Sequence, residues 1–97
     1  MPFLVCTTYA TGPNQPTEFE VYLDGAATPI ISPAQTVTGG VRLHHDVGTI
    51  STGNHSVTVK AARADALWGR LTSAASSPFA FTKPSAPDVP SGIGLVL

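Results

Sequence analysis

Residues 40–62 read GVRLHHDVGTISTGNHSVTVKAA, and this stretch decides the fold of the chain. Alternating apolar and polar side chains on both sides of the Gly53-Asn54 turn signal predict a strand, a short corner and a longer strand. Because successive side chains of a strand point to opposite faces, each strand presents one inward row. The inward rows are Val41, Leu43, His45 and Val47, then His55, Val57, Val59 and Ala61. We interpret the rest of the chain as strands added to this pair.

Two strands and a turn are predicted before this stretch. Residues 2–9 form a β-branched and aromatic run whose two faces are both partly apolar, which suits a strand covered on both sides. Residues 17–23 alternate cleanly, and their inward side chains are Phe19, Val21 and Leu23. The Asp24-Gly25 dipeptide predicts a hairpin turn into residues 28–32, an edge strand because prolines flank it. Residues 35–37 continue this strand.

The chain after residue 62 is predicted to hold a hairpin, a last strand and a tail. Residues 63–69 are rich in helix formers but too short for a stable helix, so we favour a hairpin loop that ends at Trp68-Gly69. Residues 71–75 are irregular or a broken strand. Residues 78–83 form the last strand, with Phe79 and Phe81 facing the core.

Residues 84–97 differ in composition from the rest. Pro84, Pro87 and Pro90 recur at every third position and favour an extended path. The segment ends in the apolar residues Ile93, Leu95, Val96 and Leu97. It either folds back on its own domain or frays, or it is an arm that adds a strand to another subunit. We expect a sandwich domain at 1–83 and a Pro-rich tail at 84–97.

About six short strands separated by turn signals, without a predicted helix, indicate an all-β fold, an antiparallel β-sandwich. The 97 residues suit one domain. Charged residues make up only 11%, which fits either an uncharged β-domain or a surface covered by neighbouring subunits. The net charge of −1 and scattered cations argue against nucleic-acid or membrane partners. Cys6, the single cysteine, is interpreted as a small buried residue, and the chain as made in the cytoplasm without a signal peptide.

The candidate chemical groups are histidines and carboxylates. Neighbouring His44 and His45 point to opposite faces, whereas His45 and His55 share the inner face if their strands pair. A zinc site needs three or four ligands, and the others have no candidates. Glu18 and Glu20 are interpreted as a solvated face. We therefore expect no enzyme, no catalytic residues, no metal and no cofactor.

Candidate interface residues lie around Trp68, which either covers one end of the core or anchors a partner. Arg63, Asp65 and Arg70 flank it in sequence. The apolar tail residues Ile93, Leu95, Val96 and Leu97 complete this set of candidates.

Residues 50–61 resemble the E–F corner of fibronectin type III and bacterial immunoglobulin-like domains. In that family a Tyr hydroxyl bonds a backbone carbonyl across the corner, and His55, which stands in its place here, can do the same through a ring N–H. Trp68-Gly69 with Ser73 and Ser76 resembles the Gly-x-x-Ser-x-x-Ser passage before the last strand of the family. The likeness spans residues 3–82, with residues 3–8 in the place of the family's second strand and the first strand missing.

The whole chain also looks like the small standalone immunoglobulin-like or fibronectin type III-like proteins of tailed bacteriophages and prophages. The residues that carry this likeness read VYLDG, VRLHHDV, GNHSVTVKAA, WG, PFAFTKP and PSGIGL. It implies a structural virion component, a capsid decoration or cement protein or a tail or adaptor accessory. The implied partners are capsid or tail proteins and copies of itself. The alternatives are a carbohydrate- or cell-surface-binding module with Tyr9, Tyr22 and Trp68 as its platform, and, last, a metal-assisted enzyme.

Overall fold

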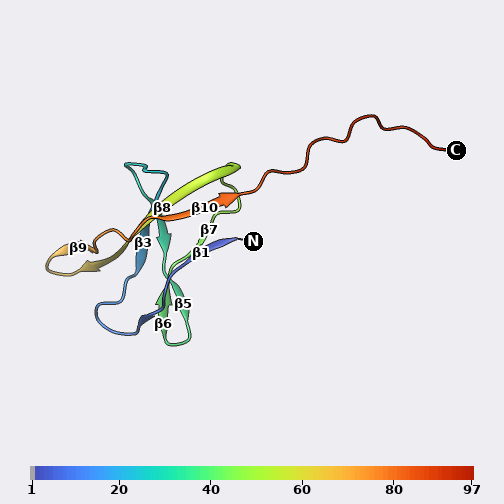
Figure 1. Cartoon of the computed structure of the whole chain (residues 1–97). Helices are drawn as coiled ribbons and strands as arrows, with labels where there is room; N and C mark the ends of the chain where they lie inside the picture. Colours follow the sequence, from blue (N-terminus) through green and yellow to red (C-terminus); the bar gives the residue numbers. More distant parts are fainter. Residues whose placement is uncertain (1) are drawn as a thin grey trace.

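The computed structural model describes residues 2–97, which form antiparallel strands and connecting segments without a helix in that range (Figure 1). This confirms the predicted all-β class. The strands are β1 (Phe3–Val5), β2 (Tyr9–Ala10), β3 (Glu18–Leu23), β4 (Ile30–Pro33), β5 (Gln35–Val37), β6 (Gly40–Arg42), β7 (His44–Asp46), β8 (Gly53–Asp65), β9 (Gly69–Thr72) and β10 (Phe79–Lys83).

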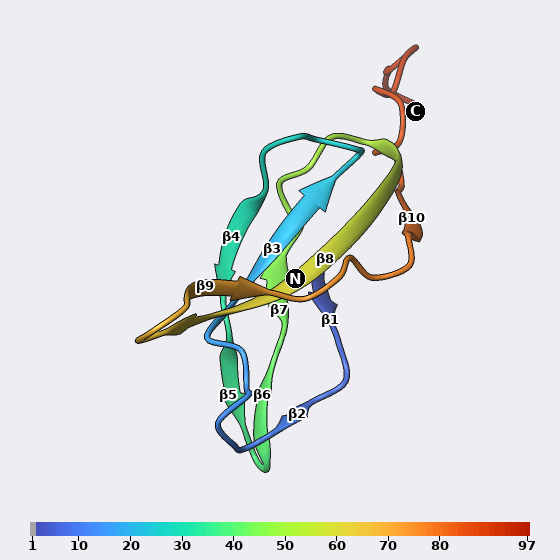
Figure 2. The same cartoon turned by 90° about the vertical axis from the view of Figure 1, so that its left-hand side faces the viewer.

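Two layers result from the strand pairing. The first layer is a five-stranded sheet in the order β10-β8-β3-β4, with β9 also paired to β8. The second layer contains the β1-β7 pair and the β2-β6-β5 sheet, which are continuous because only Leu43 separates β6 from β7. All pairs are antiparallel. This arrangement is consistent with a β-sandwich (Figure 2).

The two strands of residues 40–62 lie in different layers. Strand β7 pairs with β1, whereas β8 pairs with β3 on one edge and with β9 and β10 on the other. The interpretation of these strands as a pair is therefore wrong. The corner between them carries the chain from one layer to the other, as Ala34 does between β4 and β5.

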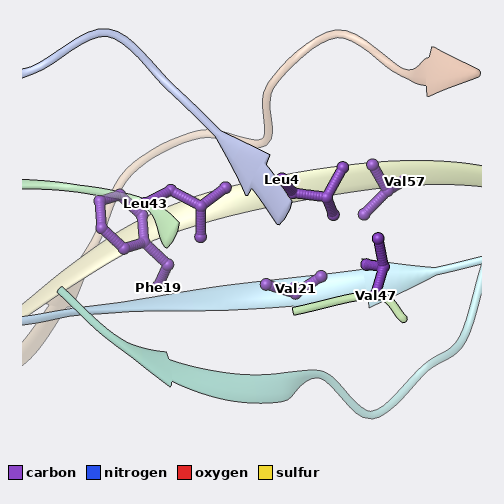
Figure 3. Packing of buried hydrophobic residues seen from close by; sticks show 6 residues of the cluster. All are labelled: Leu4, Phe19, Val21, Leu43, Val47 and Val57. Carbon is purple, nitrogen blue, oxygen red and sulfur yellow. The ribbon is translucent and has the colours of Figure 1, made fainter. Parts of the chain in front are cut away.

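The core lies between the layers and follows the alternation read from the sequence (Figure 3). Phe19 and Val21 of β3 are almost fully buried, at 2% and 1% exposure. They pack with side chains from both layers, and the buried cluster is Leu4, Phe19, Val21, Leu43, Val47 and Val57. Ile50 of the corner is half-buried against this cluster.

The turn at Asp24-Gly25 is the predicted hairpin turn. Both residues have positive φ, 53° and 73°, as a type I′ turn requires. The Ala26 N–H closes the turn on the Leu23 carbonyl at 3.1 Å. The chain then returns as β4, which is the edge strand that its prolines predicted.

The segment of residues 73–77 runs beside β8 between β9 and β10, held by serines. The backbone N–H groups of Ser73 and Ser76 donate to the Ala61 and Val59 carbonyls at 2.8 and 2.9 Å. Their hydroxyls accept from the Ala61 and Val59 N–H groups at 2.9 and 3.0 Å. Side-chain oxygens thus replace part of a backbone ladder.

Two sequence-based expectations fail at the margin of the core. The run at residues 2–9 forms two short strands instead of one, and Phe3 and Val5 are 41% and 55% exposed, so β1 is not covered on both sides. Phe79 lies on the same side of β10 as the half-buried Phe81 and stacks beside it, but it is 57% exposed and so is not buried in the core. Both corrections concern the same side of the molecule, where the layers do not close over each other.

Residues 84–97 form no strand, and their side chains are exposed. Figure 1 shows them running away from the sheets. The molecule consequently measures 76 Å along its longest axis, with a radius of gyration of 18.9 Å. A compact domain of 100 residues has a radius of about 13 Å.

Candidate protein-interaction surfaces

His55 bridges the corner between the layers. It lies on β8 with its side chain buried, and its Nε2 is 2.7 Å from the Ser51 carbonyl oxygen. A bond of this kind, from a His ring N–H to a backbone carbonyl across the corner, is what the resemblance of residues 50–61 implied for His55. Its Nδ1 is 2.7 Å from Oδ2 of Asp24 in the β3–β4 turn. Because both partners only accept, the protonated ring, which has an N–H on each nitrogen, satisfies both contacts.

The pair of His55 and Asp24 shifts the pKa of both groups. The Asp24 carboxylate, then the Ser51 carbonyl, raises the pKa of His55 above its ordinary value of 6.5, against burial and the nearby Lys83 charge, which lower it. The Ser56 N–H, which donates to Asp24 Oδ1 at 2.9 Å, and then His55 lower the pKa of Asp24 below 3.8. The ion pair therefore ties the β3–β4 turn to the corner.

This ion pair predicts a defined pH dependence of stability. The raised His55 pKa gives a contribution that is complete below pH 6.5 and lost as pH rises through the raised value. The lowered Asp24 pKa gives a second contribution to stability, which is complete above pH 3.8 and lost as pH falls through the lowered pKa. We expect Asp24→Asn, which keeps an oxygen for Ser56, to lose most stability between these two pH values. Urea unfolding of the parent and of Asp24→Asn at a series of pH values measures this loss of stability.

The control for that experiment is Asp88→Asn in the exposed tail, which should follow the parent profile. A constant difference between the parent and Asp24→Asn across and above pH 6.5 would contradict the expectation that Asp24 raises the pKa of His55.

The predicted interface residues around Trp68 form the tip of the β8–β9 hairpin. Asp65 organises the turn: its Oδ2 accepts from the N–H groups of Leu67 and Trp68 at 2.9 and 2.8 Å, and its Oδ1 is 3.7 Å from Arg63. Trp68 is 76% exposed and Leu67 82%, so Trp68 does not cover the core. The hairpin displays two large apolar side chains to solvent.

Arg70 lies further along the hairpin and holds two carboxylates of β3. Its Nη1 is 2.6 Å from Glu18 Oε2, and its Nη2 is 2.9 Å from Glu20 Oε2. Tyr22 donates to Glu20 Oε1 at 2.8 Å, and Lys60 lies 5.4 Å from the centre of the Tyr22 ring. The hydrogen bond from Arg70 contributes most to lowering the pKa of Glu20, and the hydrogen bond from Tyr22 contributes next. Arg70 thus belongs to an ion-paired sheet face and is separate from the apolar hairpin tip.

An apolar groove of about 580 Å³ opens where the layers do not close. Val5 and Tyr9 lie on one side, Ser76 and Phe79 on the other, and Val57 lies among the core residues at its floor. Its lining contains no Asp, Glu, Lys, Arg or His from the described part of the chain. A smaller hollow of about 190 Å³ shares Tyr9 with it and continues toward β9. Sequence reasoning missed this groove, although the apolar outer positions of residues 3–5 signalled it.

The four apolar tail residues lie far from the hairpin tip. Ile93 is 86% exposed, and Leu95, Val96 and Leu97 are more exposed still. Figure 1 shows the tail and the β9 hairpin at opposite ends of the molecule. The structure therefore divides the predicted interface residues among three places: the hairpin tip with Trp68, the ion-paired sheet face with Arg70, and the tail.

The candidate metal ligands and the aromatic platform are not assembled. His44 stacks on Phe3 with ring centres 4.0 Å apart. His45 lies opposite Leu4 in the second layer, whereas His55 lies in the first, opposite Phe81. Within residues 2–97, no three His, Cys, Asp or Glu side chains are grouped to hold a metal ion. The three candidates for an aromatic platform lie on different elements: Tyr9 on β2, Tyr22 on β3, and Trp68 in the turn between β8 and β9. The same residues include no helix of the length and apolar character needed to cross a membrane.

A scan of protein-family models, a search of curated proteins and a search of solved structures each found no match to this chain.

Proposed function

We propose that this chain is a non-enzymatic structural protein with an immunoglobulin- or fibronectin type III-like fold, a component of a tailed-phage virion. It is made in the host cytoplasm and joins the capsid or tail as a decoration, cement or accessory protein. Capsid or tail proteins and further copies of the chain are its partners. The phage setting rests on the resemblance of the sequence motifs described above.

The observation that carries the assembly role is the exposed apolar end of the tail, residues 91–97. Full burial of one aliphatic side chain of this size stabilises a complex by about 1.5–3 kcal/mol. Four such side chains are almost fully exposed here, from Ile93 to Leu97. A contiguous exposed apolar segment marks an interaction site, and this one lies beyond the folded layers, where a partner can reach it.

Particle association tests this role. Particles released from a host that carries the gene are separated on a density gradient, and the 10.0 kDa chain is quantified by mass spectrometry. We expect it to sediment with the particles in many copies. Deletion of residues 91–97 should move it to the soluble fractions, whereas Asp88→Asn in the tail should not.

The contrary result is equally clear. A chain that stays in the soluble fractions, while the capsid and tail proteins sediment, is not a virion component. Binding to immobilised glycans, lost in Trp68→Ala, would then favour the carbohydrate-binding alternative.

A further inference from the structure

We infer that the groove receives residues 91–97 of a second copy of the chain, which lie along β1 and β2 as an added strand. This inference deepens the proposed function and rests on it, since the contact is an assembly contact. It names both the surface and its occupant.

The acceptor side is an open strand edge beside an apolar groove. Within residues 2–97, β1 pairs only with β7, and β2 only with β6, so each has one edge without a neighbouring strand. Phe3, Val5 and Phe79 line the groove while 41–57% exposed. Such an edge is a template for an added strand, with backbone bonds for affinity and pockets for alternate side chains.

The donor side has the alternation that such a site needs. Residues 91–97 read SGIGLVL. In an extended conformation Ile93, Leu95 and Leu97 share one face, while the glycines and Val96 take the other. One face therefore enters the groove and the other faces outward. Neither this segment nor the groove lining carries a charged side chain.

The exit of the tail favours a second copy over the chain's own groove. Strand β10 begins at Phe79 beside the groove and runs away from it to Lys83. The Lys83 ammonium donates to the Gly48 and Ile50 carbonyls at 3.0 and 2.7 Å, which fixes the exit point. The prolines of residues 84–90 favour an extended path of about 3.1 Å per residue. At this rise, residues 84–90 carry the apolar end about 20 Å outward. Figure 1 shows the tail extending away from the sheets.

A complementary pair of variants tests this contact in the purified full chain. Leu95→Asp disables the donor, and Phe79→Asp disables the acceptor; both residues are exposed, so folding should persist. In sedimentation experiments the parent chain should associate with rising concentration, and each variant alone should associate about 30-fold or more weakly. The mixture should form a 1:1 complex, because each variant retains the half that the other lacks. Val5→Asp serves as the acceptor variant if circular dichroism shows that Phe79→Asp is unfolded.

Disulfide formation identifies the occupant. Cys6 is the single cysteine of the chain and lines the groove. We expect Leu95→Cys to give disulfide-linked dimers and larger species under oxidising conditions, whereas Asp88→Cys in the proline spacer should give few. A disulfide within one chain, a monomeric parent or a mixture of variants that stays monomeric would overturn the inference. None of these results bears on particle association, so the proposed function stands or fails separately.

Discussion

Replacing Phe19 by alanine is expected to lower the free energy of unfolding by about 3–5 kcal/mol. Phe19 is 2% exposed and lies between the two layers, with its ring centre 6.0 Å from that of Tyr9. Removing the ring leaves a cavity that short strands on both sides cannot fill. Because domains are stable by only about 5–15 kcal/mol, this loss is a large fraction of the total and should clearly lower the urea midpoint.

Urea unfolding followed by circular dichroism measures this effect, since the exposed Trp68 is a poor fluorescence reporter of folding. The matched control is Phe79→Ala, the same chemical change at a residue that is 57% exposed. In dilute solution it should cost no more than about 0.5 kcal/mol. Equal losses for the two variants would show that Phe19 is not part of the core.

Gly40→Ala is expected to separate β2 from β6. A Cβ at position 40 would lie 1.7 Å from the carbonyl oxygen of Tyr9, which is backbone and cannot rotate aside. The φ of 155° at Gly40 adds strain for any other residue, about 1–3 kcal/mol. With the clash, which adds about 1–3 kcal/mol as overpacking does, the total loss is about 2–6 kcal/mol.

Gly39→Ala is the control because Gly39 also has a positive φ, 89°, but no atom within 4 Å of the added Cβ. It should lose only the strain, about 1–3 kcal/mol. Hydrogen exchange should show faster exchange in β2 and β6 for Gly40→Ala, with β3 and β8 protected as in the parent. Unchanged protection in β2 would contradict the close approach.

The local features of the fold could be predicted because they depend on neighbours in sequence. Period-two alternation identified Phe19, Val21 and Val57 as inward-facing, and the Asp24-Gly25 dipeptide identified the turn. The bond from His55 to the Ser51 carbonyl spans only four residues, and the resemblance of the corner pointed to such a bond without naming its acceptor.

The long-range features could not be predicted, because they depend on which strands are adjacent and in which register. Asp24 meets His55 across 31 residues, and Arg70 meets Glu18 across 52. Alternation marked Phe79 as apolar and inward, but it cannot show that the neighbouring layer ends before covering it. The groove is therefore a property of the assembled layers and not of any one segment.

The anchorage of Lys83 has a mechanical consequence. If the tail links neighbouring copies, a pulling force on the tail acts along the axis of β10. This direction is perpendicular to the hydrogen bonds that pair β10 with β8 from Phe79↔Val57 to Lys83↔Gly53. The hydrogen bonds between the two strands then share the load in shear, so they must break together and not one at a time. The Lys83 contacts to Gly48 and Ile50 spread part of the same load into the corner. A chain of such domains would resist tension in the direction in which it is joined.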